Sequence, residues 1–557
     1  MAKDDKTFEN LPNSAVEYIN LVIKNMRYRK KARDEVREEL IDHFELYLKD
    51  CATNEEKEQK AQRLISEFGD PKLLAVLMRR AKKRCRPLWR TAVARTFQVL
   101  AAMIIFLVLY IAWFFSGKPV ITTNYIAELN KIVRPTADDS LNASPLYDKA
   151  IKAIVDINTV RGFFAINLYD INDEQKNSIR QWLAKNEEPL ALVTKGAKLP
   201  YCWQHYESKE PEQSMMTVLL PQLGPVRQIA YALCWRAWLN AQSNDFNSAF
   251  QDIETCYRLG RHYKGEKIIV EQLVGMAIEG LAMRTSREIL DSCKIESNAL
   301  ASFQQRLQTL IDGDIFKLYF NFEKLCFLDE VQRCFTESRF GPSHIYPKRF
   351  LELANIYSDI SNENPKHEPI VDLIFTLGIS PDALFSPNKT ETIAYTNAFY
   401  AHIDENFSKP PAQLKLEGID TDAQISRIIN NNTFLKIFIP TLSRINIPPW
   451  RNKIDAESTT LIIALVRYKQ DTGAFPESLD KLIEQGYIKQ IPVDPFSDNP
   501  IAYRKTDNSF LLYSWGENLK DDGGQVARDK KGKPKKFTDT GDWVFWPVVD
   551  GRYDQKK

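Results

Sequence analysis

Residues 97–115 read FQVLAAMIIFLVLYIAWFF, and this stretch decides how the rest of the chain is organised. It contains no charged side chain, and Gln98 is its single amide. At a rise of about 1.5 Å per residue, a helix of this length measures roughly 28 Å, close to the hydrocarbon thickness of a bilayer. A buried core helix rarely lacks polar residues on every face. We therefore predict one transmembrane helix, from Phe97 to Phe115.

The two flanks of this stretch differ in charge, and the difference predicts how the chain is oriented. The basic residues that precede it are Arg79, Arg80, Lys82, Lys83, Arg84, Arg86, Arg90 and Arg95. After it, Lys118 is the only close basic residue. Because positive charge stays on the cytoplasmic side, we expect the N-terminus in the cytoplasm and the chain from about residue 117 outside. Nearly a hundred mostly polar residues come first, which excludes a cleaved signal peptide.

Residues 1–88 have the pattern of a small cytoplasmic helical bundle. Apolar side chains recur at helical spacing in successive segments, as at Ala15, Tyr18, Ile19, Val22 and Ile23, and again at Val36, Leu40, Phe44 and Leu48. Thr53 or Asn54 is expected to cap a third helix that Gly69 ends. Asp70-Pro71 then predicts the start of a fourth, with proline at the first helical position.

Three segments of this bundle carry a family resemblance. They read VEYINLVIKNM, DEVREELIDHFELYLKD and EKEQKAQRLISEFGDPKLLAVLMRR, over about residues 14–84. The pattern resembles the bacterial HAAS-type domain, a short helical module placed ahead of transmembrane segments. The resemblance implies a regulatory module that binds an intracellular protein partner.

Residues 120–450 show many helical stripes and few strand-like alternations. The stretch WLNAQSNDFNSAFQDIETCYRLG, at 238–260, resembles one degenerate tetratricopeptide-type hairpin. No repeat recurs at a fixed period, so we expect an irregular helical array that binds a protein or peptide. Small residues at Gly275, Ala277, Gly280 and Ala282 are expected to permit close helix approach.

The same region holds the one cluster that suggests catalysis. Its members are Arg258, Arg261, His262, Glu271 and Glu279, on neighbouring predicted helices. A buried acid–base cluster is a signal of an active site. We favour the alternative of a solvated helix face with ordinary interhelical pairs, because the chain has no HExxH, GxSxG, P-loop or Rossmann motif.

The sequence pattern changes at Ala456, and the new pattern continues to residue 548. A short tail follows at 549–557. A helix is expected to open at Ala456, and strands are expected at 501–504, 510–514 and 541–546. The order of a long helix, a YKQDTGAFP turn, IPVDPF and a strand ending in YSWG resembles type II secretion pseudopilins. True pseudopilins begin with a cleaved leader and an apolar helix that polymerises, whereas here the apolar helix lies far upstream, at 97–115. We therefore expect a grafted pseudopilin-like α/β fold and not a pilus subunit.

The pseudopilin resemblance also implies a calcium site after the last hairpin. The candidate ligands are Asn518, Asp521, Asp522 and Asp542. Calcium takes about six to eight oxygen ligands, which carboxylates and amides supply. The spacing is not that of an EF-hand, and an Asp-Gly turn in a solvated loop explains the same residues.

Charge and cysteine spacing reduce the number of possible function classes further. A formal net charge of +2 argues against a nucleic-acid binder. The eight cysteines form no CxxC, and the six after the apolar stretch either pair in an oxidising compartment or lie as buried thiols. We expect a mainly α, non-enzymatic, single-pass protein of the bacterial inner membrane with protein partners on both sides. The alternatives are a transmembrane signalling receptor, an envelope hydrolase and a secretion-system component.

Overall fold

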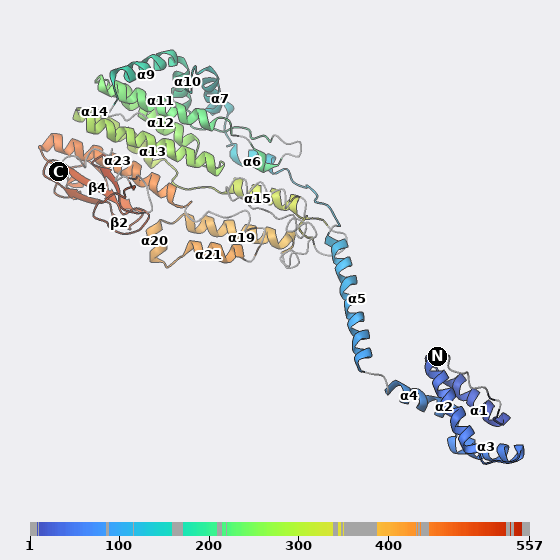
Figure 1. The fold of residues 1–557 in the computed structure, drawn as a ribbon. Helices are drawn as coiled ribbons and strands as arrows, with labels where there is room; N and C mark the ends of the chain where they lie inside the picture. Colours follow the sequence, from blue (N-terminus) through green and yellow to red (C-terminus); the bar gives the residue numbers. More distant parts are fainter. Residues whose placement is uncertain are drawn as a thin grey trace. The chain divides into compact units, whose positions relative to one another are not determined.

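The structure is a computed structural model of the 557-residue chain. It describes residues 8, 10–84, 88–114, 116–158, 171–208, 214–218, 220–337, 343–346, 349, 387–430, 432, 435, 445–530, 535 and 540–548. The chain divides into two compact units, Met1–Ala112 and Trp113–Lys557, which are described separately. The described residues are mainly helical, with small antiparallel sheets near the C-terminus, as predicted (Figure 1).

The first unit contains a bundle of short helices and one long apolar helix. Its helices are α1 (Asn13–Asn25), α2 (Lys30–Leu48), α3 (Asn54–Phe68), α4 (Pro71–Arg84) and α5 (Leu88–Phe114, which ends in the second unit). The first four helices close over one apolar core that contains Ile19, Phe44 and Leu64. The predicted signals are confirmed: the Thr53 hydroxyl accepts the N–H of Glu56, and Gly69 ends α3 at a φ of +70°.

Helix α5 contains the predicted apolar stretch but begins earlier. Its part from Ala92 to Phe114 is long and apolar enough to cross a membrane, and it is the one such helix in the described parts of the chain. The helix itself begins at Leu88, because nothing between Leu88 and Phe97 disrupts a helix, and the start of the membrane-spanning part at Phe97 stays a prediction. Arg90 and Arg95 therefore lie within α5, ahead of the predicted span. Phe115 lies outside the described residues.

The predicted basic flank lies mostly on the second half of α4. Arg79, Arg80, Lys82, Lys83 and Arg84 all belong to this helix, whereas Arg86 lies outside the described residues. Lys82 is also used inside the bundle, since its Nζ lies 2.6 Å from Glu39 Oε1 and 3.3 Å from Glu35 Oε2 on α2. These two ion pairs hold α4, which carries most of the basic flank, against α2.

The second unit is a helical array that shares its main core with a C-terminal sheet. Its helices begin with α6 (Tyr125–Val133), η1 (Asp139–Leu141), α7 (Ser144–Ala153), α9 (Asp173–Lys185), α10 (Glu187–Ala197), η2 (Met215–Thr217), α11 (Leu223–Gln242) and α12 (Phe246–His262). They continue with α13 (Ile269–Ser292), α14 (Ser297–Asp312), α15 (Asn321–Cys334), α19 (Lys389–Phe407), α20 (Pro411–Leu416), α21 (Thr421–Asn430), α23 (Ile447–Thr472) and α24 (Asp480–Glu484). Helices α11, α12, α13 and α23 stack in that order (Figure 1).

Glycines set the closest approach within this stack. A Cβ placed on Gly275 of α13 would lie 2.5 Å from the carbonyl oxygen of Gly260 on α12. That separation is too short for any real carbon–oxygen contact, so both positions require glycine. The predicted close approach is thereby confirmed at Gly275. At Gly280 the nearest atom to such a Cβ is Asp455 Oδ2 at 3.8 Å, which is ordinary contact.

The C-terminal strands are short and antiparallel. They are β1 (Val493–Asp494) paired with β2 (Asn499–Pro500), and the sheet β3 (Ala502–Lys505), β4 (Phe510–Ser514) and β5 (Trp543–Trp546). The three strands predicted from the sequence are confirmed. The helix expected to open at Ala456 begins at Ile447, so α23 crosses the predicted boundary between the helical array and the C-terminal part. Residues 549–557 lie outside the described residues.

Asp494 explains why IPVDPF and YSWG occur together. Its Oδ1 accepts the Phe496 N–H at 3.1 Å and the Ser514 hydroxyl at 2.7 Å, and its Oδ2 accepts the Trp515 N–H at 3.1 Å. The side chain is buried, so unmade bonds here would be costly. The carboxylate thus joins the turn after β1 to the end of β4.

Candidate functional site

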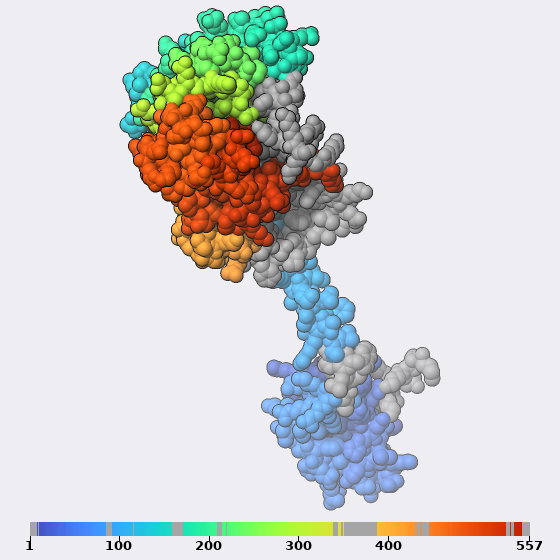
Figure 2. Space-filling model, turned by 90° about the vertical axis from the view of Figure 1, so that its left-hand side faces the viewer, coloured from blue at the N-terminus to red at the C-terminus, as the bar shows by residue number. Residues whose placement is uncertain are grey.

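A cavity of about 480 Å³ lies where α13, α23 and β5 meet. Helix α23 and the C-terminal strands, coloured orange to red in Figure 2, occupy one face of the second unit. Residues spaced by three or four along α13 line the cavity: Leu273, Ala277, Gly280, Arg284 and Arg287. This spacing places them on a single face of the helix. The small side chains of Ala277 and Gly280 leave room where larger ones would fill the space.

Arg287 is a buried positive charge in the cavity wall. Its Nη2 lies 2.8 Å from Asp455 Oδ1 on α23, and its Nη1 donates to the Thr459 hydroxyl at 2.6 Å. The guanidinium also lies over the ring of Phe545, 5.7 Å from its centroid. These contacts hold α13, α23 and β5 together at one side chain. Because Arg287 and Asp455 are both buried, losing either partner would leave an uncompensated charge.

Two further arginines line the cavity, one on α13 and one on α23. Arg284 is half-exposed, and its Nε donates to Glu288 at 2.8 Å. Arg451 lies over the Trp543 ring, 6.0 Å from its centroid. Burial lowers the pKa of the Arg451 guanidinium, and the negative charges of Asp455 and Glu517 raise it. An arginine remains protonated at neutral pH under such shifts, so both groups are positive.

The predicted calcium ligands lie near one another, but their side-chain oxygens accept hydrogen bonds from other groups of the protein. Asp542 Oδ2 accepts the N–H groups of Gly524, at 2.6 Å, and Asp522, at 3.1 Å. Asn518 donates to Asp522 Oδ2 at 2.7 Å, and Asp521 Oδ1 accepts the Gly523 N–H at 2.8 Å. Within the described ranges, no group of His, Cys, Asp and Glu is placed to hold a metal ion.

These hydrogen bonds organise a turn that brings the four predicted ligands into one region. Burial raises the pKa of Asp542 to about 6, and the neighbouring charges of Asp522 and Asp521 raise it as well. The backbone N–H bonds act in the opposite direction. Calcium binding stays a prediction from the resemblance.

The acid–base residues suggested by the sequence separate into different sites. Glu271 accepts from Tyr206 at 2.5 Å and from Gln204 at 2.8 Å, and burial raises its pKa. Glu279 instead faces Lys264, whose Nζ lies 2.8 Å away. Both glutamates are fully buried, so the expected solvated face is wrong for them. The reason is that each has a buried partner contributed by another segment.

Lys264 is the centre of a buried ion cluster. Its Nζ lies between Glu279 and Asp314, at 2.8 and 2.7 Å, and the Tyr257 hydroxyl donates to Asp314 at 2.6 Å. Burial raises the pKa of Glu279 well above its usual value, while Lys264 acts to lower it. The cluster is completely enclosed, which suits a structural role for the ion pairs.

His262 is held as a neutral imidazole. Its Nε2 lies 3.0 Å from the Leu199 carbonyl oxygen and its Nδ1 lies 2.7 Å from the Tyr147 hydroxyl. Since a carbonyl only accepts, Nε2 carries the proton and Nδ1 accepts from Tyr147. Burial, together with the positive charge of Lys267, lowers the pKa of His262 to about 4. Arg261 binds carbonyls of the α14 C-terminus, among them Leu310.

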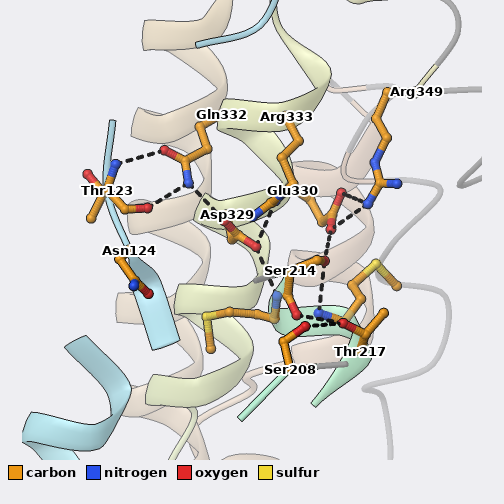
Figure 3. A network of polar contacts seen from close by, with 12 residues as sticks. Thr123, Asn124, Ser208, Ser214, Thr217, Asp329, Glu330, Gln332, Arg333 and Arg349 are labelled. Atoms are coloured by element: carbon orange, nitrogen blue, oxygen red, sulfur yellow. Dashed lines mark hydrogen bonds and ion pairs between the residues drawn. The ribbon is translucent and has the colours of Figure 1, made fainter. Parts of the chain in front are cut away.

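A polar network on α15 was missed by the sequence analysis (Figure 3). Gln332 Oε1 accepts the N–H groups of Thr122 and Thr123 at 3.1 and 3.2 Å, and its Nε2 donates to the Thr123 carbonyl at 2.9 Å. Asp329 accepts from Gln332 and from the Met215 N–H, at 2.8 and 3.0 Å. The segment that follows α5 is therefore fixed to α15. Nothing in the local pattern of α15 indicates these partners.

The same network extends to the other side of α15. Glu330 accepts from the Ser214 hydroxyl at 3.2 Å and from Arg349 Nη2 at 3.2 Å. Burial raises the pKa of Glu330, and the Arg349 charge lowers it. Ser208 and Thr217 are joined by a 2.6 Å hydroxyl contact beside it (Figure 3).

The described cysteines are all thiols, and one pair lies close together. Cys234 on α11 and Cys256 on α12 are both buried, with Sγ atoms 3.7 Å apart.

Comparison of the chain with protein-family models, with curated proteins and with solved structures finds no match. The functional argument therefore rests on the residues themselves.

Proposed function

We propose that the chain is a non-enzymatic, single-pass protein of the bacterial inner membrane whose outer unit binds a partner protein at the α13–α23–β5 cavity. The observation that carries the proposal is the cavity itself, which is lined by aromatic and aliphatic side chains and by three arginines. Small-ligand and peptide sites commonly have this character. Among the described residues that line it, none is Ser, Cys or His.

The other parts of the chain support a role in binding. The HAAS-like bundle would bind a cytoplasmic regulatory partner, and α5 would cross the membrane with the basic end of α4 on the cytoplasmic side. The hairpin of α11 and α12 is the tetratricopeptide-like element, and the sheet with α23 is the pseudopilin-like one. Neither needs to polymerise to present the cavity.

Site-specific photo-cross-linking in cells tests this proposal. A photoreactive amino acid at Val544, which lines the cavity, should give an adduct with a discrete partner. The same amino acid at Leu416, which is 74% exposed and lies on α20, is the control for random collision. Identical adducts from both positions, or none from Val544, would refute the assignment of the cavity as a binding site.

A second candidate is a signalling receptor, and the α15 network favours it. Gln332 binds the backbone at Thr122 and Thr123, only a few residues after the end of α5. A change at α15 would therefore be transmitted to the segment that enters the membrane. If the protein is such a receptor, Gln332→Leu should uncouple the outer unit from a cytoplasmic response without lowering the amount of protein in the membrane.

A further inference from the structure

Helix α4 has a row of exposed side chains that takes no part in the bundle core. Leu73 and Leu77 are 61% and 51% exposed. Arg80 and Arg84, further along the helix, are exposed as well. Positions that follow one another by three or four residues share one face of a helix. A different face of α4 packs on the bundle, since Ala75 is buried in its core. We call Leu73, Leu77, Arg80 and Arg84 the α4 stripe.

The charge on α4 is entirely positive. The helix has no acidic residue from Pro71 to Arg84. Among the described residues, Lys82 is the only base of this helix with an ion-pair partner, on α2. The bases left exposed are Lys72, Arg79, Arg80, Lys83 and Arg84. Positive charge beside a membrane follows from topology, but exposed leucines do not. The α4 stripe therefore fits a surface that is both anionic and apolar.

The chain itself keeps α4 close to the membrane that α5 would enter. Helix α4 ends at Arg84 and α5 begins at Leu88, so four Cα–Cα steps span at most about 14 Å. The apolar part of α5 starts at Ala92, about 6 Å further along the helix. The basic end of α4 thus lies within about 20 Å of that apolar part. A lipid surface is always within its reach, whereas a cytoplasmic protein has to be recruited.

We propose that the α4 stripe lies on the anionic lipid surface of the cytoplasmic leaflet, with its leucines among the acyl chains and its arginines on lipid phosphates. Helices with apolar and basic side chains bind at this depth of a bilayer. An arginine stem can lie along apolar surface while its guanidinium stays at the phosphates. Because α4 packs on α1 and pairs with α2, the contact holds the bundle against the leaflet. The inference rests on one part of the proposed function, the membrane crossing of α5.

Photo-cross-linking of the purified full chain in nanodiscs tests the inference. A photoreactive leucine analogue at Leu77 should give adducts of lipid mass in discs that contain phosphatidylglycerol. In discs of phosphatidylcholine alone the yield should fall at least about fivefold, which is the binding contribution of one base near an anionic surface. The control position is Lys72, which is exposed on the same helix but outside the α4 stripe. Its lipid yield should be low in both discs.

Charge variants locate the contact. Arg80→Gln together with Arg84→Gln should lower the Leu77 lipid yield in anionic discs at least about fivefold. The matched control is Lys49→Gln together with Arg63→Gln, which removes the same charge from exposed positions elsewhere on the bundle. The control pair should leave the yield unchanged. An equal loss in both pairs would overturn the assignment of the α4 arginines. The comparison of the two lipids uses the parent arginines, so it holds even if a charge variant fails to fold.

The remaining outcomes each contradict a defined part of the inference. Equal yields in the two lipids would overturn the anionic surface, and equal yields at Lys72 and Leu77 would overturn the stripe. A Leu77 adduct with a second copy of the chain, or in cells with another protein, would overturn the lipid as its partner. Ile105 on α5, which is 60% exposed, separates failure of this inference from failure of the proposed function. If Ile105 gives lipid adducts and Leu77 gives none, only the α4 contact falls. If Ile105 gives none, the membrane crossing falls with it.

Discussion

The close approach of α12 and α13 gives the sharpest test of the fold. Two glycines on α13 differ in surroundings: Gly275 faces the Gly260 carbonyl, while Gly280 faces the cavity. Replacing either by alanine gains about 0.5–1 kcal/mol of helix propensity. At Gly275 the new methyl would lie 2.5 Å from backbone oxygen, so the helices must separate. Overpacking of this kind costs about 1–3 kcal/mol.

Gly280→Ala is therefore the control, because its Cβ meets nothing closer than 3.8 Å. We expect Gly280→Ala to be neutral or stabilising, and Gly275→Ala to be less stable than it by about 1–3 kcal/mol. Each kcal/mol corresponds to roughly 2–4 °C of Tm in a domain of a few hundred residues.

Thermal unfolding of the detergent-solubilised chain, followed by tryptophan fluorescence, measures this difference. Trp235 and Trp238 are buried on α11, which packs on α12 and α13, so their emission reports on this stack. A Gly275→Ala variant that is as stable as Gly280→Ala would refute the packing of α12 against α13.

Three other substitutions follow from the buried polar groups. Lys264→Met should lower the free energy of unfolding, measured by chemical denaturation, by about 3–5 kcal/mol, because two carboxylates lose their buried counter-ion. Adding Glu279→Gln should restore part of that loss. Gln332→Leu removes three bonds to Thr122 and Thr123, so hydrogen exchange of the Thr123 amide should accelerate at least about tenfold while amides of α11 and α12 stay protected. His262 has a folded pKa of about 4 against about 6.5 unfolded, so its contribution, up to about 3 kcal/mol, is present above pH 6.5 and lost as pH falls toward 4. Denaturation of His262→Gln across this window should show a flatter acid limb than the parent, and an unchanged limb would contradict the neutral imidazole.

The features that local sequence determines were predicted correctly. The apolar helix, the Thr53 cap, the Gly69 stop and the strands β3 and β4 each depend on residues within a few positions of one another. Element starts were less accurate: α5 and α23 both begin earlier than expected, at Leu88 and Ile447. Ordinary helix-forming residues extend both helices beyond the apolar pattern that was used to find them.

The cavity and its charges were not predictable from local patterns. Arg287 and Asp455 are separated by more than 160 positions, and neither belongs to a motif. Glu271 and Glu279 were expected on a solvated face because charged residues are usually exposed. Their partners, Tyr206 and Lys264, come from segments whose positions only the fold determines.

The account depends most on a chain that crosses the membrane once, with the α1–α4 bundle inside and the cavity outside. Cysteine labelling of intact cells with a membrane-impermeant maleimide measures this directly, with the parent chain as background. Leu46→Cys and Leu416→Cys suit the purpose, since these side chains are 71% and 74% exposed. The account predicts that Leu416→Cys is labelled in intact cells and Leu46→Cys only after permeabilisation. The reverse pattern, or equal labelling of both in intact cells, would contradict it.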